Sequence, residues 1–312
     1  MAQKYEYSPV IPIILRNFAV KRVIAMIVFP NAKINLGLNI VSRRPDGYHD
    51  LLTIFYPVGR YAGTPSDSGR LADIIEITPS ASDTDSMKVT GRHIDCHMHD
   101  NLVWKALQLF RKSVPDLPTV DITLEKHLPD GAGMGGGSAD ASFTLRALNE
   151  IAGNPITMDD LARMALNLGA DCPFFIYNTP CIGTGTGEIL TPVSLDLGNY
   201  TLAVLKPTEG ISTRDAFARI TPSVPTYTPE KLLDMPVEQW RDRMTNDFEQ
   251  PMFALHPELR EIKEYLYESG AVYASMTGSG SAFYGLFNNP EKARQCACEA
   301  PTPFTAVSSL FL

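Results

Sequence analysis

A glycine-rich segment from residue 129 to residue 139 carries the pattern best suited to chemistry in this 312-residue chain. Five of its residues between positions 131 and 137 are glycines, and a helical pattern follows immediately. Because glycine has no Cβ atom, consecutive backbone N–H groups can turn toward one anion, and a helix N-terminus adds about half a positive charge. The pattern therefore predicts a phosphate-binding loop made of Pro129, Asp130, Gly131, Ala132, Gly133, Met134, Gly135, Gly136, Gly137, Ser138 and Ala139.

Two nucleotide motifs and a flexible connector compete with this interpretation. A Walker A motif requires lysine where Gly137 stands, so that motif is excluded. The dinucleotide pattern G-x-G-x-x-G matches Gly131, Gly133 and Gly136, but no strand ending in an acidic residue follows about 20 positions later. That pattern stays open as a weaker alternative, as does a flexible connector. We expect Ser138 to cap the helix or to contact a phosphate or Mg²⁺.

Apolar spacing and turn residues predict the elements that position the loop. Residues 26–78 alternate β-rich runs with Gly, Pro and Asp turns, which is typical of an antiparallel meander. We expect a helix at 101–113, a strand at 119–129 and two helical stretches at 141–153 and 158–169. A strand at 200–207, helices near 230–235 and 257–268, and strands within 273–287 and 304–312 indicate a second region.

The composition is that of an ordinary globular protein, with 44% hydrophobic and 20% charged residues. A net charge of -8 argues against a nucleic-acid partner, because such proteins need surplus Lys and Arg to neutralise phosphates. No apolar run approaches the roughly 18 residues needed to cross a membrane. The five scattered cysteines form no CxxC pair, so we expect no disulfide and a cytoplasmic protein.

Residues 1–25 hold a short apolar patch among Lys and Arg residues, too short for a secretory signal. Met26 then opens a strand-like run. We expect residues 1–25 to be a disordered tail or the product of an upstream start site. The boundary between two domains, 26–195 and 196–312, is expected near residue 195.

Three ordered motifs resemble those of the superfamily of galactokinase, homoserine kinase, mevalonate kinase and phosphomevalonate kinase (GHMP). They are residues 30–36 (PNAKINL), the loop with its Gly-Met-Gly-Gly-Gly-Ser run, and residues 276–282 (MTGSGSA). Within the superfamily, the chain is most similar to the 4-diphosphocytidyl-2-C-methyl-D-erythritol kinases, from Met26 to the C-terminus. The segments that carry this likeness are residues 32–36, 46–49, 100–102, 169–174 and 187–190.

The resemblance implies an α+β fold of two domains, the first like domain 2 of ribosomal protein S5 and the second ferredoxin-like. It implies transfer of phosphate from ATP, with Mg²⁺, to the 2-hydroxyl of 4-diphosphocytidyl-methylerythritol in non-mevalonate isoprenoid synthesis. The expected partners are ATP and this small cytidine diphosphate substrate, and the protein is expected to be a monomer or homodimer without nucleic-acid or membrane partners.

The resemblance also implies that Lys33 and Asp171 are the catalytic pair. A carboxylate near the substrate hydroxyl can take its proton, and an ammonium beside it can stabilise charge on the transferred group. Taken alone, a Lys in a strand is more often a solvated edge residue, and an Asp before Cys-Pro-Phe-Phe is more often a turn or cap residue.

For ATP, the resemblance implies that Asn101 and Lys126 lie near the adenine and ribose, where the alternatives are a helix-start Asn and an exposed strand-end Lys. For the acceptor, it implies that Tyr48 and His49 contact cytidine and that Asn35 lies near the catalytic centre. Without it, residues 46–49 would be a turn followed by a half-buried aromatic. The other substrate-side residues that it implies are Thr213, Phe217, Gly278, Ser279 and Gly280, of which the last three could equally form a tight turn.

Three features qualify the match. Residues 136–139 read Gly-Gly-Ser-Ala where many relatives have Gly-Gly-Ser-Ser, so no role is given to a second serine. Asp140 is expected in the first helical turn, where it would complement the helix dipole, with Mg²⁺ binding as the alternative. Three histidines and Cys96 fall within residues 93–99, but they lack a regular metal-site spacing, so we assign no metal ligands.

Two other function classes remain open at this point. One is another kinase of the superfamily that acts on mevalonate, homoserine or a sugar, for which a base-stacking Tyr-His pair has no purpose. The other is a non-catalytic ligand sensor, which would need neither Lys33 nor Asp171.

Overall fold

The computed structural model describes residues 10–15, 23–59, 71–207, 216–217, 219–301 and 304–311. A five-stranded sheet forms one edge of the molecule, in the order β1-β2-β5-β7-β6, and only the β6–β7 pair is parallel. Its strands are β1 (Val10–Leu15), β2 (Val23–Val28), β5 (Ile74–Pro79), β7 (Val120–Lys126) and β6 (Ser86–Gly91). Burial alternates along β7, as expected for a strand with one face on the core.

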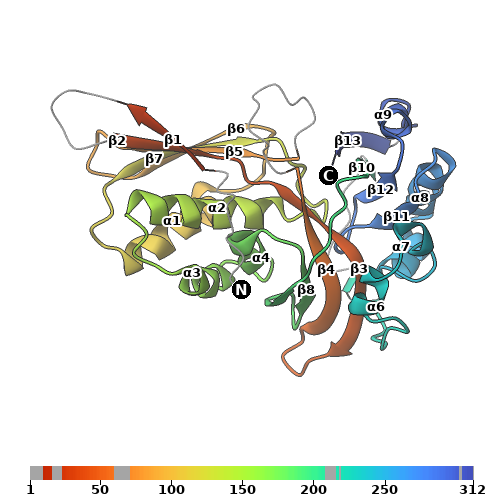
Figure 1. Cartoon of the computed structure of the whole chain (residues 1–312). Coiled ribbons are helices and arrows are strands. Elements are labelled where there is room, and N and C mark those ends of the chain that lie inside the picture. The colour runs from red at the N-terminus through yellow and green to blue at the C-terminus, as the bar shows by residue number, and fades with distance from the viewer. Residues whose placement is uncertain are drawn as a thin grey trace.

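Four helices lie on one side of this sheet (Figure 1). They are α1 (Leu102–Ser113), α2 (Gly136–Ile151), α3 (Met158–Leu166) and α4 (Cys172–Tyr177). Ten residues of α2 are buried, because the other helices and the sheet surround it. The N-terminus of α2 is thereby held at a fixed place, directly after the glycine-rich loop.

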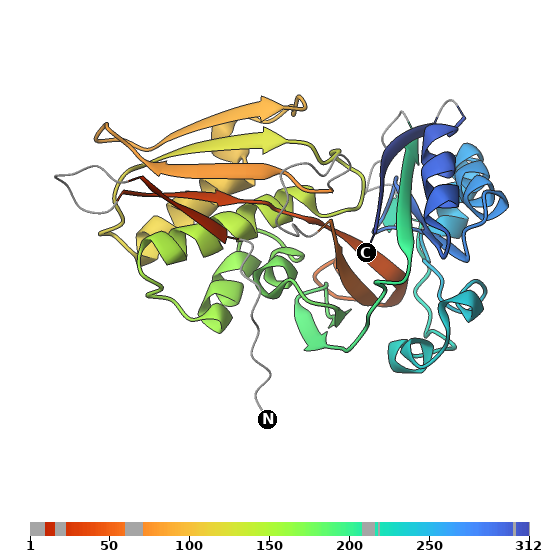
Figure 2. The ribbon, with the colours of Figure 1, turned by 45° about the horizontal axis from the view of Figure 1, so that its top comes forward.

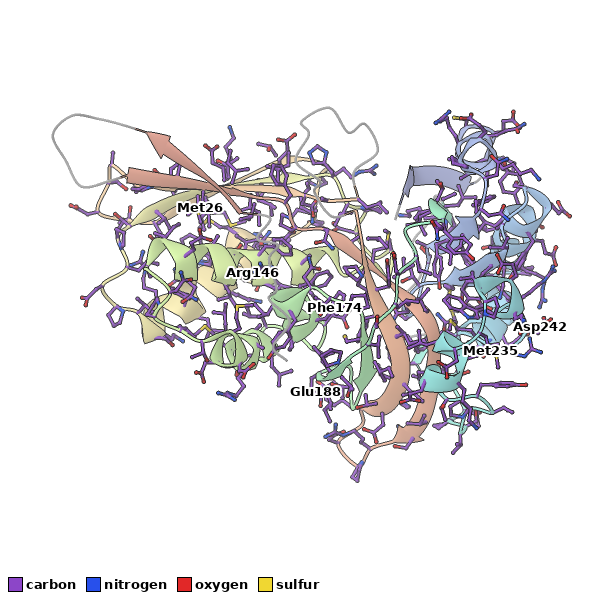
Figure 3. The ribbon with its side chains drawn as sticks, in the orientation of Figure 1. Met26, Arg146, Phe174, Glu188, Met235 and Asp242 are labelled. Atoms are coloured by element: carbon purple, nitrogen blue, oxygen red, sulfur yellow. The ribbon has the colours of Figure 1, made fainter. Side chains whose placement is uncertain are left out.

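A second sheet, in the order β3-β4-β8-β9, runs between the helical layer and the C-terminal part (Figures 1 and 2). Its antiparallel strands are β3 (Ala32–Arg43), β4 (His49–Val58), β8 (Cys181–Thr184) and β9 (Ile189–Pro192). The rings of Phe174 on α4 and Phe55 on β4 lie 5.2 Å apart, and Figure 3 shows Phe174 at this junction. This ring contact ties the helical layer to the second sheet.

The C-terminal sheet has the order β11-β12-β10-β13, with all pairs antiparallel. It contains β10 (Thr201–Pro207), β11 (Tyr273–Met276), β12 (Phe283–Phe287) and β13 (Phe304–Phe311). Helices α8 (Glu258–Glu268) and α9 (Pro290–Cys298) pack in one apolar cluster with one face of the sheet. This order and these helices make the expected ferredoxin-like β-α-β-β-α-β arrangement.

Shorter helices complete the described part of the chain. They are η1 (Met98–Asp100), α6 (Pro229–Leu233), η2 (Val237–Gln239) and α7 (Glu249–Leu255). No helix within the described ranges is both long and apolar enough to cross a bilayer.

Most predicted elements are confirmed, but the meander of residues 26–78 is wrong as a single unit. β2 and β5 join the first sheet, whereas β3 and β4 form a hairpin in the second, since each pair finds a different apolar layer to cover. Helices α4, α7 and α9 and strands β6, β8 and β9 were not predicted.

The expectation of a disordered tail differs from the structure at two segments. Residues 10–15 form β1, which pairs with β2 from Val10 opposite Val28 to Leu15 opposite Val23, and β2 begins before Met26. The edge of β2 presents backbone N–H and C=O groups, and β1 forms an antiparallel pair with them. The other residues of the tail lie outside the described ranges, and the domain boundary near residue 195 stays a prediction.

Candidate active site

The predicted phosphate loop connects β7 to α2. Gly131, Gly133 and Gly135 have φ angles of +61°, +72° and +74°, so left-handed residues alternate along the loop. Such alternation turns successive N–H groups toward one side, which suits an anion. The first intrahelical bond of α2 runs from the N–H of Ala139 to the carbonyl of Gly135 at 2.8 Å, so the preceding amides face out of the helix N-terminus.

Close packing explains why two of these positions lack side chains. A Cβ atom on Gly133 would lie 2.0 Å from the carbonyl oxygen of Thr277, and one on Gly135 would lie 2.9 Å from the ring of Phe175. A Cβ atom on Gly135 would also lie 3.3 Å from Cγ of Lys33. The loop therefore lies directly against the candidate catalytic lysine and against the turn after β11.

Lys33 lies on the edge strand β3, whose outer side is covered by the loop: its N–H donates to the carbonyl of Met134 at 3.0 Å. Its side chain is 4% exposed, so the alternative of a solvated edge lysine is wrong. The Nζ atom donates to Oδ1 of Asn35 at 2.6 Å and lies 3.5 Å from Oδ2 of Asp171. Nζ also lies 5.3 Å from the ring centre of Phe55.

Asp171 occupies the N-cap position of α4, but its side chain makes no capping bond. Its side chain is 33% exposed, so one face of the carboxylate is accessible to a substrate while the other faces Lys33. Burial raises the pKa of the adjacent Cys172 thiol to about 11, so this thiol stays protonated at neutral pH. An accessible carboxylate beside a buried ammonium can accept a hydroxyl proton next to a transferring phosphate.

Asn35 fixes the direction of the Lys33 ammonium. Besides Lys33, its Oδ1 atom accepts from the N–H of Gly278 at 2.9 Å, and its Nδ2 atom donates to Oγ1 of Thr53 at 3.0 Å. With a donor and an acceptor thus assigned, the amide has one orientation. These contacts bring Asn35 and Gly278 next to Lys33, and their roles toward the substrate stay a prediction.

Lys126 lies beneath the start of α2, between two buried carboxylates. Its Nζ atom donates to Oδ2 of Asp73 at 2.5 Å and to Oδ2 of Asp140 at 2.7 Å. Burial alone would lower the pKa of Lys126, but the charges of Asp140 and Asp73 outweigh it and raise that pKa. The side chain is 3% exposed, so the alternative of an exposed strand-end lysine is wrong.

Asp140 itself is not in the first turn of α2, so the expected role toward the helix dipole is wrong. It lies more than one turn inside the helix, and its Oδ1 atom is buried without a hydrogen-bond partner. Burial, followed by the charge of Asp73, raises the pKa of Asp140 well above its usual value. Ser138 is not the N-cap either, because Gly135 takes that position.

Asn101 caps α1, its Oδ1 atom accepting from the N–H of Val103 at 2.9 Å. The start of α1 lies beside the loop, because a Cβ on Gly137 would meet Leu102 at 3.6 Å. Asn101 is therefore a helix-start residue close to the predicted phosphate site, and its contact with adenine or ribose stays a prediction.

The acceptor-side residues lie at the hairpin between β3 and β4, where His49 begins one face of β4. His49 contacts Phe217, with ring centres 5.4 Å apart, and Tyr48 at the hairpin end is 66% exposed. Further along this face lie Leu51, Thr53 and Phe55, spaced two residues apart. Thr213 lies outside the described residues.

Gly187 connects this face to the catalytic pair. A Cβ atom there would lie 3.7 Å from Oδ1 of Asp171 and 3.9 Å from Leu51. The strand thus leads from the exposed Tyr48 and His49 to the accessible carboxylate. The turn between β11 and β12 contains Gly278, Ser279 and Gly280, and it also lies against the loop. A tight turn and a substrate-side segment are therefore compatible descriptions of these residues.

Sequence reasoning missed three buried polar residues that support the site. Asp73 accepts from the N–H groups of His127 and Leu128 as well as from Lys126, and thereby fixes where β7 enters the loop. Thr53 orients Asn35, and Asn246 holds the turn after β11. Their partners lie far away in the sequence, so no local spacing signalled them.

One open alternative is decided by the chain that follows the loop. After α2 the chain continues into α3 and α4 instead of a parallel strand, so the dinucleotide-binding alternative is wrong. Residues 93–99 are exposed apart from one, and the described residues contain no group of three His, Cys, Asp or Glu that could hold a metal ion.

Comparison with known proteins agrees with this geometry. Two family models match: the GHMP kinases N terminal domain over residues 101–179 and GHMP kinases C terminal over residues 231–305. A relative from Parabacteroides distasonis, named 4-diphosphocytidyl-2-C-methyl-D-erythritol kinase, is 47% identical over 85% of this chain and 93% of its own length. A relative of the same name from Bacteroides thetaiotaomicron is 47% identical over 84% of this chain and 92% of its own length.

Solved structures show the same fold. A crystal structure of 4-(cytidine 5'-diphospho)-2C-methyl-D-erythritol kinase has a TM-score of 0.75 and 32% identity, covering 92% of this chain and all of that chain (100%). The mevalonate kinase of Methanococcus jannaschii has a TM-score of 0.66 at 13% identity, with 92% and 98% covered, and shares the fold. The chain belongs to the 4-diphosphocytidyl-2-C-methyl-D-erythritol kinase family of the GHMP kinases.

Proposed function

We propose that this protein transfers the γ-phosphate of ATP to the 2-hydroxyl of 4-diphosphocytidyl-2-C-methyl-D-erythritol, a step of non-mevalonate isoprenoid synthesis. The observation that carries the proposal is the meeting of three parts at one place: the glycine loop, the buried ammonium of Lys33 and the accessible carboxylate of Asp171. Phosphoryl transfer requires such a phosphate cradle, a positive charge and a proton acceptor. The family names of the relatives supply the acceptor substrate.

In this reaction the loop and the first amides of α2 bind the phosphates of ATP. The acceptor hydroxyl lies beside Asp171, which takes its proton as the oxygen attacks phosphorus and ADP leaves. Lys33 stabilises the charge on the transferred group, and Asn35 holds Lys33 in place. Lys126 lies under the loop, where Asp73 and Asp140 balance its charge, so it supports the start of α2 and is not accessible itself.

The face of β4 accounts for the acceptor. Tyr48 offers an exposed aromatic ring on which a base can stack, and the half-buried rings of His49 and Phe217, in contact with each other, extend that surface. Two residues of strand span about 7 Å, so several such steps from His49 toward Asp171 leave room for a diphosphate and a short polyol.

Mg²⁺ fits the site as an ion that enters with ATP. Mg²⁺ commonly keeps several waters and binds through one or two protein oxygens together with substrate phosphates. The hydroxyl of Ser138, at the N-terminus of α2, is the side chain we assign to it. Asp140 suits it poorly despite its unpartnered Oδ1, since the ammonium of Lys126 already occupies the other oxygen. When bound, Mg²⁺ neutralises charge on the phosphates.

We also propose that the enzyme works in the cytoplasm. The five cysteines, all within the described residues, are free thiols, and three of them are buried. Free buried thiols are the usual state in a reducing compartment.

The test is a parallel assay of ADP release with Mg-ATP and one of four acceptors: the diphosphocytidyl-methylerythritol, mevalonate, homoserine or galactose. We expect turnover with the first alone. Lys33→Ala and Asp171→Asn should each lower kcat at least about 100-fold, as expected for loss of a charge stabiliser or a proton acceptor. Asp196→Asn serves as the matched control, because Asp196 is an exposed carboxylate that accepts a hydrogen bond from the nearby N–H of Gly198.

Turnover of a different acceptor would replace the proposed substrate. A fall of less than about tenfold in kcat for either variant would remove that residue from the proton-transfer and charge-stabilising roles. Binding of ATP without turnover of any acceptor would favour the ligand-sensor alternative.

A further inference from the structure

The turn between β11 and β12 is a junction of the active site. Oγ1 of Thr277 donates to the carbonyl of Gly133 at 3.1 Å and accepts from the N–H of Asn35 at 3.2 Å. The N–H of Gly278 donates to Oδ1 of Asn35 at 2.9 Å, the same atom that receives the Lys33 ammonium. The position of this turn therefore sets both the phosphate loop and the direction of Lys33.

Asn246 holds this turn from the side away from Asn35. Its Nδ2 atom donates to the carbonyls of Met276 and Gly278, both at 2.8 Å, and its Oδ1 atom accepts from the N–H of Phe248 at 3.0 Å. The residue is 2% exposed, and both of its amide hydrogens are in use. Gly278 is thus held through its carbonyl by Asn246 and through its N–H by Asn35.

The backbone around Asn246 is itself bound to the strand that carries Lys33. The N–H of Leu38 on β3 donates to the carbonyl of Thr245 at 2.9 Å, and the N–H of Asp247 donates to the carbonyl of Leu38 at 2.8 Å. The carboxylate of Asp247 accepts from the N–H of Ile40 at 2.8 Å. Asn246 is therefore fixed relative to β3, and it transmits that position to the turn.

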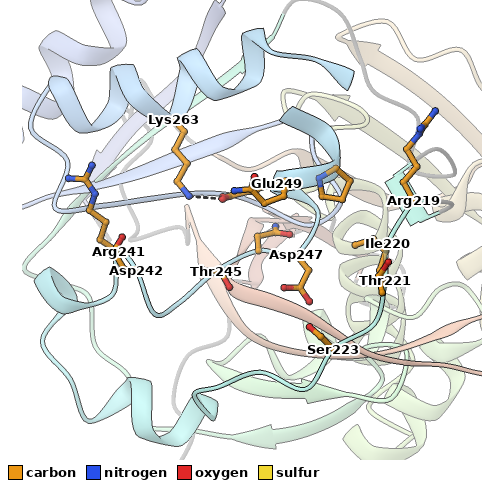
Figure 4. A pocket seen from close by; sticks show the side chains of 13 residues that line it. Arg219, Ile220, Thr221, Ser223, Arg241, Asp242, Thr245, Asp247, Glu249 and Lys263 are labelled. Atoms are coloured by element: carbon orange, nitrogen blue, oxygen red, sulfur yellow. Dashed lines mark hydrogen bonds and ion pairs between the residues drawn. The ribbon is translucent and has the colours of Figure 1, made fainter. Parts of the chain in front are cut away.

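Asn246 lies outside the reacting centre. With Thr245, Asp247 and Glu249 it lines a pocket of about 560 Å³ whose lining contains neither Lys33, Asp171 nor any residue of the loop (Figure 4). Figure 4 shows Glu249 paired with Lys263 at this pocket, and the same carboxylate accepts from the N–H of Met276 at 2.9 Å. The turn is thus anchored at Met276 and Gly278 by Asn246 and Glu249.

We propose that Asn246 is a positioning residue for phosphoryl transfer: it fixes the turn at Gly278 and, through Asn35, the ammonium of Lys33. This inference rests on the proposed function, since its readout is turnover. Within the part of the chain that the structure describes, the side-chain hydrogen bonds of Asn246 go to Met276, Gly278 and Phe248 and not to Lys33 or the loop, so its effect passes through the turn.

The test is Asn246→Asp, assayed for kcat and KM between about pH 6 and pH 8. The carboxylate keeps an acceptor for Phe248 but faces the carbonyl oxygens of Met276 and Gly278, which displaces the turn. We expect kcat at the upper pH about 10- to 100-fold below wild type, the scale of a misplacement near 1 Å, with less change in KM for ATP. Burial against two carbonyls raises the pKa of the new carboxyl, and its protonated form can donate one bond. The ratio of variant to wild-type kcat should therefore rise as the pH falls.

Asn149→Asp is the matched control. Asn149 is also buried, and its amide donates to the carbonyl of Ile156 at 2.9 Å and accepts from the N–H of Ile156 at 3.1 Å, near the end of α2 remote from the loop. This variant should lose stability but keep the wild-type kcat, and its ratio to wild type should not change with pH.

Asn246→Ser, which retains a single hydroxyl donor, provides a second variant and should have an intermediate kcat. A folded Asn246→Asp protein with the wild-type kcat at the upper pH would overturn the proposal. If neither Asn246 variant folds while Asn149→Asp does, Asn246 is a structural residue and the proposal also fails. Wild-type turnover, measured alongside, reports on the proposed function separately: its absence would refute that function, whatever the variants do.

Discussion

Replacing Gly133 by alanine tests whether the phosphate loop must lie against the turn after β11. A Cβ atom at Gly133 would lie 2.0 Å from the carbonyl oxygen of Thr277 and 3.2 Å from that of Gly280. Both are backbone atoms, so no change of rotamer relieves the overlap. The φ angle of +72° adds a strain of about 1–2 kcal/mol for any residue with a Cβ atom.

The size of the effect follows from the overlap. An ordinary contact between two non-bonded heavy atoms is roughly 3.5 Å, so the loop and the turn must separate by more than about 1 Å. A displacement of that size between reacting groups costs about 100-fold in rate. We therefore expect Gly133→Ala to lower kcat about 100-fold and to lower the free energy of unfolding by roughly 1–3 kcal/mol, the usual cost of overpacking.

Gly131→Ala is the matched control in the same loop. Its φ angle of +61° imposes similar strain, but a Cβ atom there would have nothing within 4 Å. Initial rates with ATP and the cytidylyl acceptor, together with thermal unfolding of each variant, should show a comparable strain cost but a much smaller loss of kcat for Gly131→Ala. Equal values of kcat for the two variants would refute the argument from contact with the turn.

Two further predictions concern the acceptor surface and the buried charges. Tyr48→Ala should raise the KM for the cytidylyl acceptor by roughly 5- to 150-fold, the range for losing one stacked base, and leave the KM for ATP unchanged; an unchanged acceptor KM in steady-state kinetics would remove Tyr48 from the base site. Burial and the charge of Asp73 raise the pKa of Asp140 in the folded protein, so folding favours its protonated form. This contribution to stability is fully present below about pH 4, the pKa of Asp in the unfolded chain. It is lost as the pH rises through the higher pKa of the folded state. Asp140→Asn should remove this contribution, so urea unfolding at about pH 5 and pH 8 should show wild type losing stability relative to the variant toward the higher pH. A difference in unfolding free energy that does not vary with pH would contradict the assigned pKa shift.

Local sequence was sufficient for the loop and for most helices. Five glycines before a helix have few uses other than close backbone approach to an anion, and amphipathic spacing marks α1, α3 and α8 because one face of each must be buried. The family motifs also identified Lys33 and Asp171 as a pair, although 138 positions in the chain separate them and only the folded β3 and α4 bring their charges to 3.5 Å.

The environment of each site residue depended on contacts that no local pattern encodes. Lys126 ends a strand, where a lysine is normally solvated, yet Asp73 and Asp140 enclose it from two other elements. Asn35 meets Thr277 across 242 positions of the chain, and Asn246 reaches Gly278 only because β11 and β3 lie side by side.

The sequence by itself determined the glycine loop and most of the helices and strands, since those outcomes depend on backbone freedom and on the period of apolar residues. Tertiary structure alone decided which buried polar groups support Lys33, because a buried donor or acceptor must be paired, and its partner is whichever group the packing of distant elements brings within hydrogen-bond distance.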